Sequence, residues 1–142
     1  MFFVLDENIP PKLAELLKVI FSENSNDQIH SITDLELRGV TDAELFKKIK
    51  ILANGEKCVF ISGDRNIRKR PPEIQSFKNN NMIAFFCPPS ICGKSLQERA
   101  LYVVNAWKGI CEVASKSKEK DIYLLPSKSF SLTPTEIRRN KK

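Results

Sequence analysis

An α/β fold with a mostly parallel sheet is predicted from three features of this sequence. Short, continuous apolar runs alternate along the chain with longer segments whose apolar residues recur at helical spacing. Because these runs are apolar throughout, they are typical of parallel strands that are buried on both faces. Prolines, glycines and asparagines mark the junctions. We therefore expect a three-layer α/β/α domain, with helices on both faces of a sheet of four or five strands joined by right-handed connections.

The first half of the chain supplies three predicted strands and two predicted helices. The strands are Phe2–Leu5, Ile29–Thr33 and Cys58–Ser62. The first helix runs from Pro11 to about Phe21, because leucines recur there every three or four residues. Thr41 and Glu44 form a capping-box pattern, which predicts a second helix that stops at Asn54-Gly55.

The second half continues the alternation and ends in a tail. The expected elements are a helix over Pro71–Asn79, a strand over Met82–Cys87, a helix over Leu96–Val113 and a strand over Ile122–Leu125. Residues 1–126 are thus expected to form one domain. Residues 127–142 are polar and basic, and we expect them to be a mobile tail.

Composition narrows the class of protein. The chain has 142 residues, and 23 Lys and Arg against 17 Asp and Glu give a net charge of +6, which favours polyanionic partners such as nucleic acid. Surplus lysines that serve only solubility are the alternative. The four cysteines form no close pair, and there is a single histidine, so a structural zinc site is not expected. With no signal-peptide core and no membrane-spanning run, we expect a cytoplasmic protein.

Three acidic residues suggest a metal site. Asp6 follows the first strand, Asp64 follows the third, and Asp42 opens the second helix. The carboxyl ends of parallel strands converge on one crevice, so these carboxylates could provide the hard oxygen ligands that Mg²⁺ or Mn²⁺ prefers. Each acid also has a structural alternative, as a turn residue or as a favourable charge in a helix's first turn.

Four short motifs connect these acids to a known family. They are V-L-D-E-N-I-P (Val4–Pro10), H-S-I-T-D-L (His30–Leu35), L-R-G-V-T-D-A-E-L (Leu37–Leu45) and F-I-S-G-D (Phe60–Asp64). In their order and spacing the chain resembles the PIN-like nucleases, especially a compact group linked to bacterial toxin–antitoxin pairs. The resemblance covers roughly Met1–Pro88 and does not extend to the residues from Leu96 onward.

The resemblance implies a metal-dependent endoribonuclease that uses Mg²⁺ or Mn²⁺ and acts on RNA. It further implies a toxin restrained by an antitoxin protein, and a homodimer. Carried onto this sequence, the catalytic residues are Asp6, Asp42 and Asp64, with Ser62 as the small hydroxyl residue that orients the cluster. The implied metal ligands are these three acids together with Glu44 and Asn66.

One position departs from the family pattern. The related group usually has a second acid two residues after the last one, followed by an aromatic residue, whereas Asn66 and Ile67 stand here. Asn66 still offers a carbonyl oxygen but removes one negative charge. A catalytically inactive PIN-like module that binds RNA or protein is therefore an alternative.

A basic segment directly after Asp64 is the predicted nucleic-acid contact. It contains Arg65, Arg68, Lys69 and Arg70. Beside an acidic metal cluster, such charges would grip the flanking phosphates of RNA; the alternative is ordinary solvated surface. A phosphoacceptor receiver-like domain also carries acids after its strands, but it needs a lysine at the end of a late strand. Phe86-Cys87-Pro88-Pro89 offers none.

Overall fold

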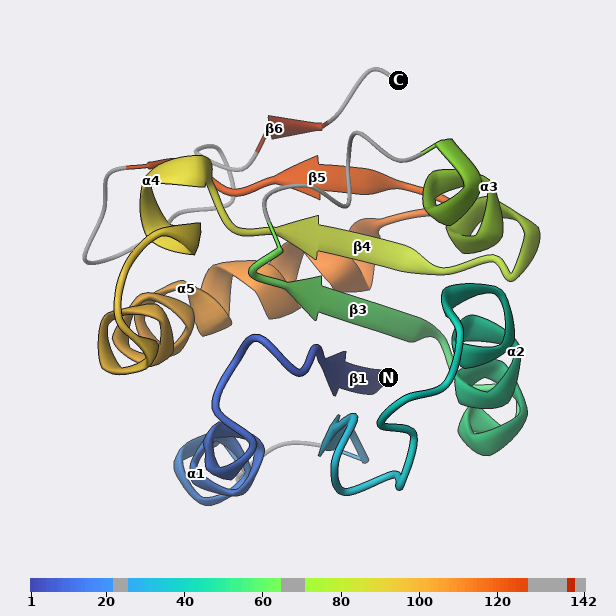
Figure 1. Cartoon of the computed structure of the whole chain (residues 1–142), viewed down its shortest axis with the longest axis horizontal. Coiled ribbons are helices and arrows are strands. Elements are labelled where there is room, and N and C mark those ends of the chain that lie inside the picture. Colours follow the sequence, from blue (N-terminus) through green and yellow to red (C-terminus); the bar gives the residue numbers. More distant parts are fainter. Residues whose placement is uncertain (22–25, 65–70, 128–137, 140–142) are drawn as a thin grey trace.

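The computed structural model describes residues 1–21, 26–64, 71–127 and 138–139. It confirms the α/β prediction, with one six-stranded sheet in the order β2-β1-β3-β4-β5-β6. The strands are β1 (Phe2–Leu5), β2 (Gln28–Ser31), β3 (Cys58–Ser62), β4 (Ile83–Phe86), β5 (Ile122–Leu124) and β6 (Arg138–Arg139). The first five pair in parallel, so their carboxyl ends lie at one edge of the sheet (Figure 1).

Helices connect the parallel strands. They are α1 (Lys12–Phe21), α2 (Asp42–Ala53), α3 (Pro71–Asn79), α4 (Pro89–Cys92) and α5 (Leu96–Lys116). The strands β1, β3 and β4 are buried along their whole length, which explains their continuous apolar sequences. Within the described ranges, no helix combines the length and apolarity needed to cross a membrane.

Two hydrophobic clusters, one on each face of the sheet, make up the core. Alternate residues of each strand belong to opposite clusters: Phe3 packs with α1 and α5, whereas Phe2 packs with α2 and α3. Trp107 of α5 lies 4.9 Å from Phe3 between ring centroids. Val103 and Trp107, which belong to an apolar stripe along this helix, are buried in the protein's own core and are not available as a dimer surface. That stripe therefore gives no support to a homodimer.

The predicted capping box at Thr41 is wrong. Thr41 is the N-cap of α2, but its side chain makes no capping hydrogen bond. Thr41 and Glu44 are both exposed, so water can satisfy the groups that a capping box would pair. A complete capping box occurs instead at the start of α5, between Ser95 and Glu98.

Other differences are small and have local causes. The strand β2 ends at Ser31 because the side chains of Ser31 and Asp34 each bond the other's backbone N–H, at 3.0 and 3.2 Å, and turn the chain. Helix α5 extends three residues beyond the predicted end, and α4 was not predicted. Within the predicted tail, Arg138–Arg139 form β6, which pairs antiparallel with the outer side of β5 and satisfies backbone groups that would otherwise be open.

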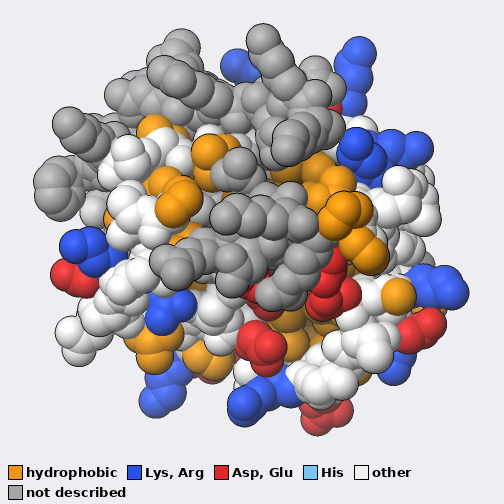
Figure 2. Space-filling model, turned by 45° about the horizontal axis from the view of Figure 1, so that its top comes forward, with side chains coloured by type: hydrophobic (Ala, Val, Ile, Leu, Met, Phe, Trp, Pro, Cys, Tyr) orange, Lys and Arg blue, Asp and Glu red, His pale blue; other side chains and the backbone are white. Residues whose placement is uncertain are grey.

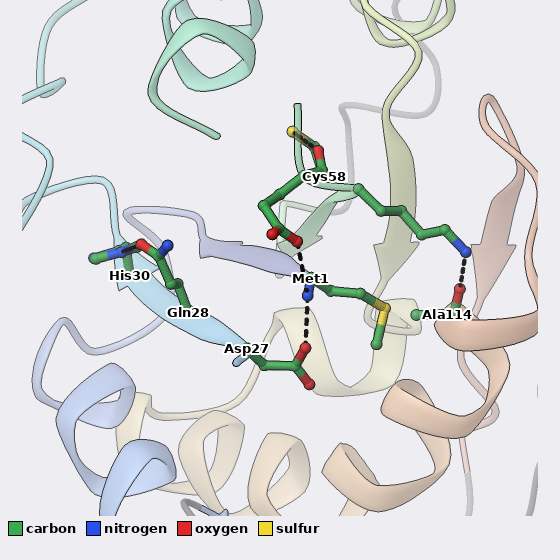
Figure 3. A network of polar contacts seen from close by, with 8 residues as sticks. Met1, Asp27, Gln28, His30, Cys58 and Ala114 are labelled. Atoms are coloured by element: carbon green, nitrogen blue, oxygen red, sulfur yellow. Dashed lines mark hydrogen bonds and ion pairs between the residues drawn. The ribbon is translucent and has the colours of Figure 1, made fainter. Parts of the chain in front are cut away.

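The amino edge of the sheet carries a network of complementary charges (Figure 3). The amine of Met1 lies 2.6 Å from an Asp27 carboxylate oxygen and 3.4 Å from one of Glu56. Lys57 Nζ donates to the carbonyl oxygens of Ala114, Ser115 and Ser117 at the end of α5, at 3.1, 3.3 and 3.1 Å. These contacts tie β1, β2 and β3 to α5 at the edge opposite the predicted site.

Candidate active site

The register of the sheet places the candidate residues side by side. Leu5 of β1 pairs with Ile61 of β3, and the Asp6 N–H donates to the Ile61 carbonyl at 2.9 Å. The next residues along the two strands, Asp6 and Ser62, are therefore neighbours at the carboxyl edge, where Figure 1 shows the arrowheads of β1 and β3 together. Two predicted site residues far apart in sequence thus meet through the parallel pairing alone.

Ser62 joins the two acids. Its hydroxyl, which is fully buried, donates to Asp6 Oδ2 at 2.7 Å. Ser62 Oγ also accepts the backbone N–H of Asp64 at 3.1 Å, and Asp6 Oδ1 accepts the Glu7 N–H at 2.8 Å. The predicted orienting position of Ser62 therefore coincides with a hydroxyl that contacts both Asp6 and the backbone of Asp64.

The electrostatics of Asp6 are unusual for an aspartate. Burial raises the pKa of Asp6 from 3.8 to about 6, although the hydrogen bonds from Ser62 and the Glu7 N–H lower it. The charges of Glu7 and Asp64 add to the rise in this pKa. Asp6 is half-buried, and a carboxylate whose pKa is raised by partial burial and by a neighbouring acid is common in functional sites.

Asn8 and Arg99 complete the arrangement and were not predicted as site residues. Asn8 Oδ1 accepts the Gly63 N–H at 2.8 Å, and its Nδ2 lies 3.5 Å from Asp6 Oδ2. Arg99 of α5 donates from Nη1 to the Asn8 carbonyl at 2.6 Å. Asn8 stood within the motif V-L-D-E-N-I-P. Arg99 could have been noticed as a charge four residues before Val103 on the buried side of α5.

The structure does not add Asp42 or Glu44 to this group. Asp42 is the half-buried first residue of α2, and Glu44 is exposed on that helix. Across the four described ranges, no three His, Cys, Asp or Glu side chains are grouped so as to hold a metal ion. The expected three-acid cluster is therefore reduced to Asp6 and Asp64, with Ser62 between them.

The remaining predicted residues lie outside the described part of the chain. They are Arg65, Asn66, Arg68, Lys69 and Arg70. On the face drawn in Figure 2, the Lys and Arg side chains are spread around the rim, and several Asp and Glu side chains lie near the middle. The drawn basic residues thus form no single patch that would stand in for the predicted segment.

Cysteine and histidine chemistry have little support at this edge. Burial raises the pKa of Cys87, which follows β4, to about 12, so its thiol stays protonated at neutral pH. His30 contacts Gln28 Oε1 at 3.2 Å and the ring of Phe2, as expected for a structural histidine (Figure 3). Oxygen ligands and carboxylates are the chemistry that the described site offers.

The fold and the site together define a class of α/β proteins with paired acids at the carboxyl edge of a parallel sheet. Comparison with protein families is more specific: the model of the PIN-like domain family matches residues 1–89. The match covers more than half of the chain and confirms the resemblance of its motifs, so the protein belongs to the PIN-like family, whose fold is of the nuclease type. No curated protein and no solved structure matches the chain at a significant level.

Proposed function

We propose that this protein is a metal-dependent ribonuclease that hydrolyses phosphodiester bonds with Mg²⁺ or Mn²⁺. The observation that carries the proposal is the Asp6–Ser62–Asp64 arrangement at the ends of two adjacent parallel strands. Membership of the PIN-like family supports the nuclease class over a phosphoacceptor receiver-like domain.

The donor set of the site fits a hard divalent cation. Burial and the negative charges of Glu7 and Asp64 raise the pKa of Asp6, and a bound cation would favour its charged form. Mg²⁺ keeps several of its waters and is commonly held by one or two carboxylates plus substrate phosphate, so a pair of aspartates is sufficient. When bound, such an ion supplies Lewis-acid stabilisation of the phosphate and a more acidic water.

The residues of the chain have separate roles in this proposal. Asp6 and Asp64 would hold the ion through their carboxylate oxygens. Ser62 occupies one lone pair of Asp6 Oδ2 with its hydroxyl proton, which fixes the direction of the carboxylate. Burial of Ser62 behind the two acids keeps that hydrogen bond away from competing water.

RNA is the proposed substrate because of the net charge of +6 and the family resemblance. The segment with Arg65, Arg68, Lys69 and Arg70 follows Asp64 directly and is the proposed contact to phosphates flanking the cleaved bond. A toxin role, with an antitoxin protein that restrains the nuclease, extends the same proposal, as does a homodimer.

Cleavage of RNA by the pure protein tests this proposal. We expect cleavage in Mg²⁺ or Mn²⁺, none in EDTA, and strong loss of activity in Asp64→Asn. Mn²⁺ should also raise the melting temperature of the wild type, because an ion that binds only the folded protein stabilises it. It should not raise the melting temperature of Asp64→Asn, which lacks one of the two proposed metal-binding carboxylates. Asp27→Asn, which removes a carboxylate at the opposite edge, is the matched control. RNA that stays intact after long incubation with Mn²⁺ would contradict the proposal.

An inactive RNA- or protein-binding module is the second candidate. It is favoured by Asn66, which replaces an acid of the family pattern, and by the lack of a three-ligand group in the described residues. Retained RNA binding with no cleavage in either metal, and no effect of Asn66→Asp on binding, would select this candidate. Cleavage that appears only in Asn66→Asp would place the defect at this position.

A further inference from the structure

Asn8 links the ends of the two strands that carry the acids. Its side-chain oxygen accepts the Gly63 N–H at 2.8 Å, between Ser62 and Asp64. A Cβ at position 63 would lie 3.2 Å from Asn8 Oδ1 and 3.7 Å from Arg99 Cδ. The absence of a side chain at Gly63 therefore lets Asn8 Oδ1 approach the backbone that leads into Asp64, while the Arg99 stem lies at ordinary contact distance.

Arg99 holds Asn8 from the other side. The capping box of Ser95 and Glu98 fixes the first turn of α5, and the Arg99 N–H bonds the Ser95 carbonyl at 3.0 Å. From this position Arg99 Nη1 donates to the Asn8 carbonyl at 2.6 Å across 91 residues of sequence. Arg99 is thus the contact through which α5 reaches the turn after β1.

Stability alone does not explain an arginine at this place. Arg99 Nε is buried and, within the described part of the chain, makes no hydrogen bond. A buried donor without a partner costs free energy, which an apolar side chain of similar size would avoid. The hydrogen bond from Arg99 Nη1 to the Asn8 carbonyl gives this arginine a role that an apolar side chain could not fill.

We propose that Asn8 and Arg99 are positioning residues that hold the Asp6–Ser62–Asp64 arrangement in its working geometry, with Arg99 acting through Asn8. This inference rests on the proposed nuclease function and deepens it. It also extends the functional unit to α5, because Arg99 lies beyond the residues 1–89 that match the PIN-like family. A misplacement of about 1 Å at a reacting group can cost roughly a hundredfold in rate.

The first test measures the Gly63 amide and needs no cleavage. Selective ¹⁵N labelling of glycine gives at most five amide signals, since the chain has five glycines. Arg99→Met and Asn8→Ala should each speed hydrogen exchange of the Gly63 amide by roughly tenfold to a hundredfold, because its acceptor is lost or loosened. Arg99→Lys, which keeps a donor and the charge, should restore most of the protection. Lys108→Met and Asn105→Ala, at exposed positions of α5, are the matched controls and should change nothing.

The second test separates positioning from direct substrate contact. Arg99→Met should lower kcat by roughly tenfold to a hundredfold while KM stays within about twofold. A raised KM with unchanged kcat and unchanged Gly63 exchange would overturn the proposal, since Arg99 would then bind substrate directly. Unchanged Gly63 exchange in a folded Arg99→Met would overturn it as well. If Arg99→Met does not fold, Arg99→Gln provides the same test, because its shorter side chain cannot span to the Asn8 carbonyl.

The two tests fail independently of the proposed function. Faster Gly63 exchange in Arg99→Met, in a protein that cleaves no RNA, would support the positioning network and refute the nuclease. Cleavage by the wild type that is matched by Arg99→Met would support the nuclease and refute the network.

Discussion

The two edges of the sheet handle charge in opposite ways. At the amino edge, the Met1 amine lies between Asp27 and Glu56, and the Lys57 ammonium lies among three carbonyl oxygens, so each charge meets its complement. At the carboxyl edge, Asp6 is half-buried near Asp64, and burial raises the pKa of Asp6 to about 6. We therefore expect the first edge to stabilise the fold and the second to lower its stability, a trade-off that is common at functional sites.

The largest expected effect is the loss of RNA cleavage when the negative charge of Asp6, at the carboxyl edge, is removed. Asp6→Asn should lower RNA cleavage about a thousandfold, because loss of a metal-binding carboxylate forfeits several kcal/mol of transition-state stabilisation. The melting temperature of this variant at pH 7 should equal or exceed that of the wild type. Cleavage and thermal unfolding, measured on the same preparation, check both points. A variant that loses activity only because it unfolds would contradict the contrast between the edges.

The pH dependence of stability gives the next largest effect. The folded-state pKa of Asp6, about 6, lies above its ordinary value of 3.8, so the folded protein binds this proton more tightly than the unfolded chain. The Asp6 contribution to the free energy of unfolding should therefore fall as the pH rises from about 4 to about 6, by up to about 3 kcal/mol, and then level off. Urea unfolding of the wild type and of Asp6→Asn across this range, without metal, measures the difference. Parallel curves for the two proteins would show that Asp6 is not responsible.

Breaking the lysine contact at the amino edge should have a smaller effect of a different kind. Lys57→Met removes the donor to three carbonyl oxygens at the end of α5, where a positive charge is also favoured by the helix dipole. We expect the free energy of unfolding to fall by about 2 kcal/mol, with cleavage per folded molecule unchanged. Lys108→Met, an exposed change on the same helix, is the control for loss of a lysine.

The smallest effect is expected at the ion pair of the chain terminus. Asp27→Asn weakens the 2.6 Å contact to the Met1 amine and should lower the free energy of unfolding by about 1 kcal/mol or less, because the pair is partly exposed. Burial lowers the pKa of that amine, but Asp27 and Glu56 more than offset this and raise it. The contribution of the pair should therefore be full below pH 8 and fade as the pH rises through the raised pKa. Urea unfolding at pH 7 and pH 10 measures both effects, and a larger loss at pH 10 would be the contrary result.

The sequence was sufficient to predict five of the six strands and the proximity of Asp6 to Ser62. The apolar runs of β1 and β3 predicted a parallel pair, and that pairing brings Asp6 beside Ser62. The capping-box pattern was ambiguous: Thr41 with Glu44 fits it without forming the bonds, whereas Ser95 with Glu98 forms both. A short pattern cannot decide whether a side chain turns to the backbone or to water.

The features of the candidate site that the sequence did not predict depend on long-range contacts. The contact of Arg99 with Asn8 depends on how α5 packs across the sheet, which no local pattern encodes. The described residues include no three-acid group, and the reason is related. Asp42 follows a loop after β2 and lies on a helix, so its position is set by that loop and not by strand pairing.

The register of β1 against β3 has a consequence for how this site can change. Both strands send alternate side chains into two separate cores, so a slip of one residue would exchange the contents of the two cores. Packing of the two cores therefore fixes the register of β1 against β3, and this register keeps positions 6 and 62 adjacent whatever side chains occupy them. New chemistry could be placed at these two positions by substitution alone, with the distance between them already guaranteed by residues that never touch a substrate.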